Sequence, residues 1–339
     1  MRFHLCSRNV VKASASPRKP AEKGWLWTQS GGTIRNRLKE KNFRPKKSMG
    51  QNFMEDDSVI WDIVDYSGVN GSCIVVEVGP GTGAMTKQLV KSGARVYAVE
   101  KDDRLFRYLT NESQDIEDDE DLKETRGMAH AVSENLTVLH QDVLKVDLGK
   151  VARDARALYF PEDSNNQSER ILLMGNLPYN ITRDFLMKAL PMGEEYSTLL
   201  LMLQHEVAVR LIENSPGSTD WRAMNIILQY YCDAKYVFRV DRFKYTPVPK
   251  VDGALVELQL KSKSERKPVP CEKDFISLVK RGFLQKRKML SNALRPTLEG
   301  PEIQECLKQC GLPVDARAQS LSLDEFVALS WAIHEYQKA

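Results

Sequence analysis

The residues best suited to chemistry lie near the middle of the chain, where Asn176-Leu177-Pro178-Tyr179 follows the apolar run Ile171–Met174. Pro178 fixes its own φ angle and biases Leu177 away from helix, so the Leu177 carbonyl and the Asn176 amide can face the same way. Both oxygens can then accept hydrogens from one exocyclic amine, and base stacking on the Tyr179 ring is worth about 1–3 kcal/mol. The pattern predicts a nucleobase-amine site, with an ordinary strand-to-helix turn as the alternative.

A glycine-rich turn, Glu77–Gly83, follows a predicted strand and opens a helix. Glycines let the backbone approach a ligand at the carboxyl edge of a sheet. An acid before the turn and a proline within it are typical of S-adenosylmethionine methyltransferases rather than of pyrophosphate-binding loops. Glu100 ends the next predicted strand, where a carboxylate can accept both hydroxyls of a cofactor ribose. A surface acid at a strand end is the alternative. The turn's glycines are Gly79, Gly81 and Gly83.

Three other positions are candidates for ligand contacts. Asp142 follows the third predicted strand and can accept from a cofactor adenine amine, or simply cap the next turn. Gln51 and Asn52 precede the first helix and offer amides to the amino-acid end of the cofactor, or form an ordinary helix-entry loop. Tyr245 precedes a proline-stiffened turn and is predicted to clamp an extruded base opposite Tyr179, with core packing as the alternative.

Short apolar runs alternate with amphipathic stretches, which predicts an α/β fold with a doubly wound, Rossmann-like parallel sheet. Residues 112–134 and 149–170 are expected to be surface insertions. Residues 261–270 are expected to be a charged linker into an all-helical tail. The predicted strands are Cys73–Val78, Arg95–Val99, Leu136–Leu139, Ile171–Met174, Thr198–Leu203 and, last, Ala254–Leu260.

Composition limits the class of protein. The 339 residues contain no apolar run of the length that crosses a bilayer, so no membrane partner is expected. The six cysteines form no CxxC pair, which indicates a reducing compartment. Cys306 and Cys310 lie one helical turn apart without a neighbouring histidine, so helix packing is expected there and no metal site.

Charge is distributed unevenly along the chain. Residues 1–50 carry 13 Lys and Arg against 2 acidic residues, whereas Glu112–Glu124 holds 8 acids and one lysine. Residues 1–42 are predicted to be an organelle transit peptide, or a basic arm that touches RNA. Basic residues return over 261–295, with 11 against 3 acids, and predict phosphate contacts from a helix, with a solvated helix face as the alternative. The candidates there are Arg281, Lys286, Arg287 and Lys288.

Five segments, in this order and spacing, resemble the ribosomal-RNA adenine dimethyltransferases of the KsgA family, over residues 43 to about 295. They are Gln51–Phe53, Glu77–Gly83, Asn176–Tyr179, Leu203–Ala208 and Pro247–Val251. The resemblance implies a methyltransferase domain at 43–260 and a helical RNA-binding domain at 261–339. It also implies N6-dimethylation of adjacent adenines in small-subunit ribosomal RNA by a monomer, with naked RNA or a pre-small subunit as substrate, and a role in ribosome biogenesis.

The resemblance also assigns individual residues. Asn176–Tyr179 would hold the adenine, whereas Asn52, Met54, Gly79, Glu100, Asp142 and Asn176 would contact S-adenosylmethionine. Met54 stands where leucine is usual, Tyr245 where phenylalanine is common, and Gly253 where serine is typical. The segment around 190–193 resembles plant organellar members, so a plastid is expected ahead of a mitochondrion. The alternatives are a large-subunit rRNA methyltransferase, and a non-catalytic RNA-binding assembly or transcription factor with the same fold.

Overall fold

The structure is a computed structural model that describes residues 49–54, 56–110, 129–161, 170–295 and 297–338, together with residues 45 and 127. The predicted transit peptide or basic arm at 1–42 lies outside the described residues, as does the acidic run Glu112–Glu124. Within the described chain, no helix combines the length and the apolar character needed to cross a membrane.

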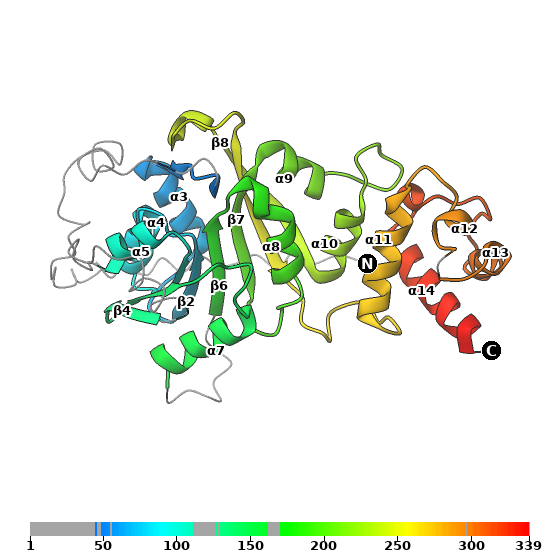
Figure 1. The fold of residues 1–339 in the computed structure, drawn as a ribbon, viewed down its shortest axis with the longest axis horizontal. Coiled ribbons are helices and arrows are strands. Elements are labelled where there is room, and N and C mark those ends of the chain that lie inside the picture. The colour runs from blue at the N-terminus through cyan, green and yellow to red at the C-terminus, as the bar shows by residue number, and fades with distance from the viewer. Residues whose placement is uncertain are drawn as a thin grey trace, which may run out of the picture.

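An eight-stranded sheet forms the centre of the molecule (Figure 1), with the strand order β4-β5-β3-β2-β6-β7-β10-β8. The five neighbouring strands β5, β3, β2, β6 and β7 pair in parallel, whereas β4, β10 and β8 pair antiparallel with their neighbours. The predicted doubly wound sheet is confirmed, with antiparallel edges added. The strands are β2 (Cys73–Val78), β3 (Arg95–Glu100), β4 (Ala129–Ser133), β5 (Leu136–His140), β6 (Arg170–Asn176), β7 (Thr198–Gln204), β8 (Cys232–Val240) and β10 (Gly253–Leu260), with β1 (Phe53–Met54) and β9 (Tyr245–Thr246) forming a separate pair.

Helices cover both faces of the sheet because successive strand residues point to opposite sides. In β2, Ile74, Val76 and Val78 join one buried cluster, whereas Cys73 and Val75 join the other. The first face packs against α7 (Leu148–Tyr159), α8 (Thr182–Ala189) and α10 (Ala223–Tyr231), and the second against α3 (Asp57–Ser67), α4 (Ala84–Lys91) and α5 (Asp103–Thr110). Helix α9 (His205–Ile212) follows β7.

Both predicted insertions contain regular structure in their described parts. Residues 129–133 form the edge strand β4, which pairs with β5. Residues 148–159 form α7. Its N-cap is Asp147, whose side chain accepts from the Lys150 backbone N–H, and its inner face buries Val151, Ala152 and Ala155. The expectation of a surface insertion at 149–170 is therefore wrong for α7, because this apolar helical stripe packs onto the sheet.

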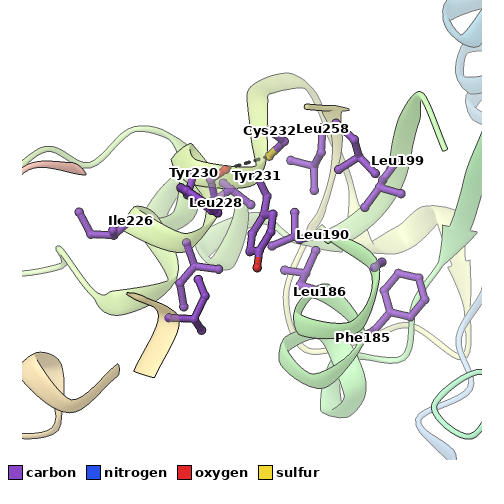
Figure 2. Packing of buried hydrophobic residues seen from close by; sticks show 14 of the residues in the cluster. Phe185, Leu186, Leu190, Leu199, Ile226, Leu228, Tyr230, Tyr231, Cys232 and Leu258 are labelled. Carbon is purple, nitrogen blue, oxygen red and sulfur yellow. Dashed lines mark hydrogen bonds between the residues drawn. The ribbon is translucent and has the colours of Figure 1, made fainter. Parts of the chain in front are cut away.

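After β10, the described elements are all helices, as predicted: α11 (Glu272–Leu284), α12 (Leu290–Ala293), α13 (Gly300–Gln309), the short η4 (Ala318–Ser320) and α14 (Leu323–Lys338). These helices share one continuous buried cluster with α8 and α10. Figure 2 shows the part of this cluster where Tyr231 and Leu228 lie opposite Leu186 and Leu190. The boundary at 260/261 stays a prediction.

The predicted linker at 261–270 is anchored by a buried arginine. The Arg266 guanidinium donates to the Pro191 carbonyl at 2.7 Å and to Glu272 Oε2 at 3.0 Å, and it lies over the Tyr231 ring. Burying this charge is tolerated because it is paired and hydrogen-bonded. The helical tail is thus fixed to the sheet domain at this point.

We predict that Gly193→Ala lowers the free energy of unfolding by about 2–3 kcal/mol. A Cβ atom at Gly193 would lie 2.1 Å from the Lys261 carbonyl oxygen, so one backbone segment would have to move. Chemical denaturation of the purified variant measures the change. Gly71→Ala is the matched control, since its nearest neighbour would be 3.8 Å away. Equal stability of the two variants would contradict the prediction.

Candidate active site

A cavity lies where β2, β3, β5 and β6 end at the carboxyl edge of the sheet. It collects nearly all of the residues predicted to bind cofactor or base, although those that line it come from five separate segments of the chain. Gly83 and Tyr245 are the two predicted residues that do not line it. Those that do are Gln51, Asn52, Met54, Glu77, Gly79, Gly81, Glu100, Asp142, Asn176, Leu177, Pro178 and Tyr179.

The glycine-rich turn brings its backbone to the cavity wall. Gly79 and Gly81 have φ angles of 65° and 59°, in the left-handed region that favours glycine. A Cβ atom at Gly79 would meet no other atom within 4 Å, so this stretch of backbone is open to a ligand. Gly83 instead begins α4, where its carbonyl accepts from Lys87 N–H. Its contribution is to the turn rather than to the wall.

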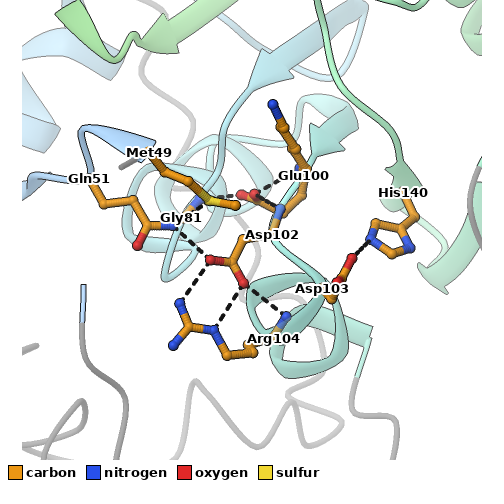
Figure 3. A network of polar contacts seen from close by, with 9 residues as sticks. Met49, Gln51, Gly81, Glu100, Asp102, Asp103, Arg104 and His140 are labelled. Atoms are coloured by element: carbon orange, nitrogen blue, oxygen red, sulfur yellow. Dashed lines mark hydrogen bonds and ion pairs between the residues drawn. The ribbon is translucent and has the colours of Figure 1, made fainter. Parts of the chain in front are cut away.

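Glu100 is buried at the end of β3 and organises two turns at once (Figure 3). Its Oε1 accepts from the backbone N–H groups of Lys101 at 2.8 Å and Asp102 at 2.7 Å, and its Oε2 accepts from Gly81 N–H at 3.3 Å. Burial raises its pKa to about 7 despite these hydrogen bonds. Oε2 makes the longest of the three contacts and is the oxygen with capacity left for a ribose hydroxyl.

Glu77 is a second buried carboxyl at the same edge. Thr86 Oγ1 donates to its Oε2 at 2.6 Å, which ties the end of β2 to α4. Burial raises the pKa of Glu77 to about 7, and the negative charge of Glu100 adds to the shift. Two groups that titrate near neutrality therefore lie at one cavity, which is typical of functional sites.

Asp142 lines the cavity just beyond the end of β5. Its Oδ2 is 2.8 Å from Lys101 Nζ, and its Oδ1 accepts from Leu144 N–H at 3.0 Å. Although burial alone raises the pKa of Asp142, the Lys101 ammonium and the Leu144 N–H lower it by more. The carboxylate is therefore an ionised acceptor. Its partner, Lys101, is not among the residues that the sequence predicted for the site. Only the position of Lys101 directly after Glu100 could have indicated that it lies at the cavity.

The Asn176 side chain has a fixed orientation. Its Nδ2 donates to the Asn52 carbonyl at 3.1 Å. Because a carbonyl only accepts, Nδ2 must face Asn52, and Oδ1 is left as the acceptor on the other side of the amide. Pro178, with φ −54° and ψ 131°, begins the turn η2 (Tyr179–Ile181), and the Tyr179 ring is half-buried at the wall. Burial raises the pKa of Tyr179, so its hydroxyl stays neutral.

Tyr245 is not among the residues that line the cavity. Its ring is 2% exposed and belongs to the core beneath α3 and α4. The reason is the pairing of β9 with β1, which sets Tyr245 opposite Met54. Its hydroxyl fills the space over Gly253, where a Cβ atom would be 2.6 Å away. The ring of Tyr245 is therefore packed in the core of this ligand-free structure, and its role in a clamp opposite Tyr179 stays a prediction.

Similarity to known proteins identifies the family. A family model described as ribosomal RNA adenine dimethylase matches residues 42–335. An Arabidopsis thaliana protein, named chloroplastic ribosomal RNA small subunit methyltransferase, is 32% identical and covers 96% of this chain and 87% of its own length. The Clostridium perfringens ribosomal RNA small subunit methyltransferase A is 35% identical, with coverages of 87% and 93%.

The chain belongs to the ribosomal RNA adenine dimethylase family. It is a methyltransferase, as the motif order indicated. Two solved structures share the fold. A dimethyladenosine transferase from Plasmodium falciparum has a TM-score of 0.62 at 20% identity, covering 84% of this chain and 98% of its own. The 23S rRNA methyltransferase ErmE has 0.55 at 21% identity, with coverages of 83% and 99%.

The predicted RNA-binding residues occupy two kinds of structure. Arg281 lies on α11, but this helix ends at Leu284, so Lys286, Arg287 and Lys288 lie in the following turn and not on a helix face as expected. Lys286 Nζ donates to the Thr219 carbonyl at 2.8 Å, which makes this lysine partly structural. Arg287 and Lys288 are exposed.

We predict that binding of S-adenosylhomocysteine weakens by about five- to tenfold between pH 8 and pH 6. Glu100, with a pKa of about 7, loses its negative charge over this range and becomes a poorer acceptor for the ribose hydroxyls. Titration calorimetry of wild type and Glu100→Gln measures the effect, and the variant should bind more weakly with a flatter pH profile. An unchanged pH profile in the variant would contradict this role.

The buried carboxyls of Glu77 and Glu100 also make the free energy of unfolding of the ligand-free protein depend on pH. The pKa values of Glu77 and Glu100 are raised on folding from 4.5 to about 7, so the folded state holds more protons than the unfolded state between these values. Their contribution to the free energy of unfolding is therefore full below pH 4.5 and is lost as the pH rises through 7. A ligand that contacts the ionised carboxylates opposes this loss.

Proposed function

We propose that this chain transfers methyl groups from S-adenosylmethionine to N6 of adenines in small-subunit ribosomal RNA, dimethylating adjacent adenines. The observation that carries the proposal is that Asn176 and the Leu177–Tyr179 turn line the same cavity as Glu100 and Asp142. An amine acceptor and a nucleoside-binding wall are thereby brought together. The small-subunit assignment is supported by the names of the Arabidopsis and Clostridium relatives.

The residues present fit the methyl donor. Glu100 would take the ribose hydroxyls, Asp142 the adenine amine, and the open backbone at Gly79 the portion between them. Asn52 and Met54 would border the amino-acid end. S-adenosylmethionine supplies an electrophilic methyl group on a sulfonium, which no side chain of the protein could provide.

The chain's own contribution to the reaction is position. The Asn176 Oδ1 and the Leu177 carbonyl would accept the two N6 hydrogens, which favours the pyramidal, electron-richer nitrogen of the transition state. Tyr179 would stack on the base. No histidine or cysteine lies among the described residues that line the cavity. Holding N6 in line with the methyl group, about 3–3.5 Å away, can lower the barrier by several kcal/mol without a general base.

A second transfer requires little rearrangement. The monomethylated amine has one N–H left and can rotate to keep a single hydrogen bond to either acceptor. Both acceptors are fixed by the backbone turn and by Asn52, so neither depends on the other for its orientation. Dimethylation can therefore proceed in the same cavity.

A separate groove lies between α8, α10 and α11, next to the helical tail. We call it the basic groove, and its cationic residues are Arg183, Arg222, Lys273, Lys280 and Arg281. Glu272 is its one acid, and Arg266 already pairs with it. Within the described chain, Arg183, Lys273 and Lys280 form no ion pair. Arg183 lies two residues after Ile181, which lines the cavity, so RNA phosphates on the groove would lead directly to the base site.

We also propose a plastid as the compartment, which the chloroplastic name of the Arabidopsis relative supports. That the protein is a monomer stays a prediction. Contribution to ribosome biogenesis follows from the proposed substrate.

Replacing Asn176 by alanine tests the proposed function. We expect Asn176→Ala to reduce methyl transfer to purified small subunits by at least about 10²-fold, because an acceptor for the developing charge is lost. RNA affinity should stay within a few fold of wild type. Asn292→Ala, at an exposed position on α12, is the matched control. Incorporation of labelled methyl groups measures transfer, and primer extension locates the modified adenines. Unchanged methylation by Asn176→Ala would refute the assigned role.

The basic groove generates a separate prediction. Arg183→Ala and Lys280→Ala should each weaken RNA binding and reduce the slope of log affinity against log salt by about 0.7–0.9. Lys91→Ala, an exposed lysine on α4, should leave the slope unchanged. Filter binding over a range of salt concentrations measures the slopes. Equal slopes for all three variants and wild type would remove the groove from the RNA path.

A further inference from the structure

The loop that precedes the first helix touches both halves of the cavity. We call residues 49–54 the N-terminal strap. On the cofactor side, the Phe53 ring lies against Gly81, where an added Cβ would be 3.0 Å from it. On the base side, a Cβ at Gly50 would lie 3.2 Å from Asn180 Oδ1 and 3.4 Å from Pro178 Cβ. The strap is therefore a wall shared by the two sites.

The strap also sets the orientation of the base acceptor. The Asn52 carbonyl receives the Asn176 Nδ2 hydrogen bond that leaves Oδ1 as the acceptor. The Asn52 side chain is itself bonded to the Gly50 carbonyl at 3.1 Å, which folds the strap into a tight turn. A shift of this turn would move the Asn52 carbonyl and release the Asn176 amide.

One hydrogen bond anchors the strap to the cofactor side. Gln51 Nε2 donates to Asp102 Oδ2 at 2.9 Å, across 51 positions of sequence (Figure 3). Asp102 is 1% exposed and is fixed in turn by Arg104, whose Nη2 is 2.9 Å from the same oxygen. Its backbone N–H donates to Glu100. The anchor thus starts at the turn that would bind the ribose.

Asp102 is held as a carboxylate. Burial would raise its pKa, but hydrogen bonds from Arg104 and Gln51 lower the pKa below its ordinary value. A buried, ionised acceptor makes a stronger hydrogen bond to an amide than a neutral one does. Gln51 consequently donates its Nε2 hydrogen to Asp102, whereas its amide, from its place before the first helix, was expected to face the amino-acid end of the cofactor.

We infer that Gln51 and Asp102 are positioning residues for methyl transfer. Their hydrogen bond holds the N-terminal strap, and the strap holds the Asn176 amide with Oδ1 toward the target amine. This inference rests on the proposed function of the site. It assigns a role to a buried acid outside the family motifs, and it makes the cofactor turn and the base acceptor parts of one connected unit.

The test is an exchange of the two partners. Gln51→Glu sets two carboxylates against each other, and Asp102→Asn keeps an oxygen for Arg104 N–H but turns an N–H₂ toward Gln51. Each single variant should lower kcat by about tenfold or more at saturating S-adenosylmethionine. The double variant Gln51→Glu/Asp102→Asn restores a charge-assisted hydrogen bond of reversed polarity. It should recover kcat to within about threefold of wild type.

Two measurements separate positioning from other roles. Calorimetry with S-adenosylhomocysteine should show much smaller changes in affinity than in kcat, and melting temperatures identify variants that fold poorly. Gln51→Ala, which leaves Asp102 and its hydrogen bond from the Arg104 backbone N–H intact, should lower kcat in the same way as Asp102→Asn. Combining Gln51→Ala with Asp102→Asn should cost no more than about twofold beyond the worse single variant.

Failure of the inference differs from failure of the proposed function. If wild type methylates small subunits but the exchanged pair shows no recovery, or the two losses multiply, the anchor does not act on Asn176. If the loss in every variant is only in cofactor affinity, Gln51 contacts the cofactor and the inference is overturned. If wild type itself transfers no methyl group to adenine, the proposed function fails first. Gln229→Ala, at an exposed position on α10, is the control for substitution at a site away from the cavity, and its kcat should match that of wild type.

Discussion

Two carboxylates buried at one edge of the sheet constrain everything around them. Glu77 and Glu100 cannot be removed from water without hydrogen-bond donors, and the donors come from the turns themselves. Gly81 can supply its N–H because its positive φ angle turns the peptide toward Glu100. The glycine-rich turn, the start of α5 and the first turn of α4 are therefore fixed together. A cavity bordered by such groups has excess acceptor capacity for hydroxyls and favours a cationic ligand.

Much of this arrangement could be predicted from the sequence, because it depends on local rules. Continuous apolar runs identify the central parallel strands, and the carboxyl ends of such strands meet at one edge. The edge strands were missed because β4 and β8 are largely polar or partly exposed along their length. For Tyr245 the sequence left core packing and a base clamp open for a different reason: its position depends on the pairing of two short strands almost 200 residues apart, which no local pattern encodes. The Gln51–Asp102 contact is non-local in the same way.

The helical tail is part of the same packing unit as the sheet domain. Trp221, before α10, is fully buried and donates to the Leu321 carbonyl at 3.0 Å, and Arg266 ties the 261–270 segment to Pro191. The basic groove lies between helices joined in this way, so its distance from the cavity is set by a packed interior. In the proposed function this matters, because RNA phosphates bound on the groove would determine which nucleotide reaches the base site.

The N-terminal strap explains how a site without a general base can remain selective. Catalysis by position fails if the acceptor rotates, since an Asn176 amide turned by 180° would present N–H₂ to the amine and repel it. The Asn52 carbonyl prevents this rotation before any ligand binds, because it belongs to the N-terminal strap, which is held by β1 on one side and by the Gln51–Asp102 hydrogen bond on the other. The orientation is thereby established during folding, and none of the binding free energy of the base is needed for it. In the proposed reaction the same fixed acceptor would meet the amine in both transfers, which is the condition under which one cavity could methylate the same nitrogen twice.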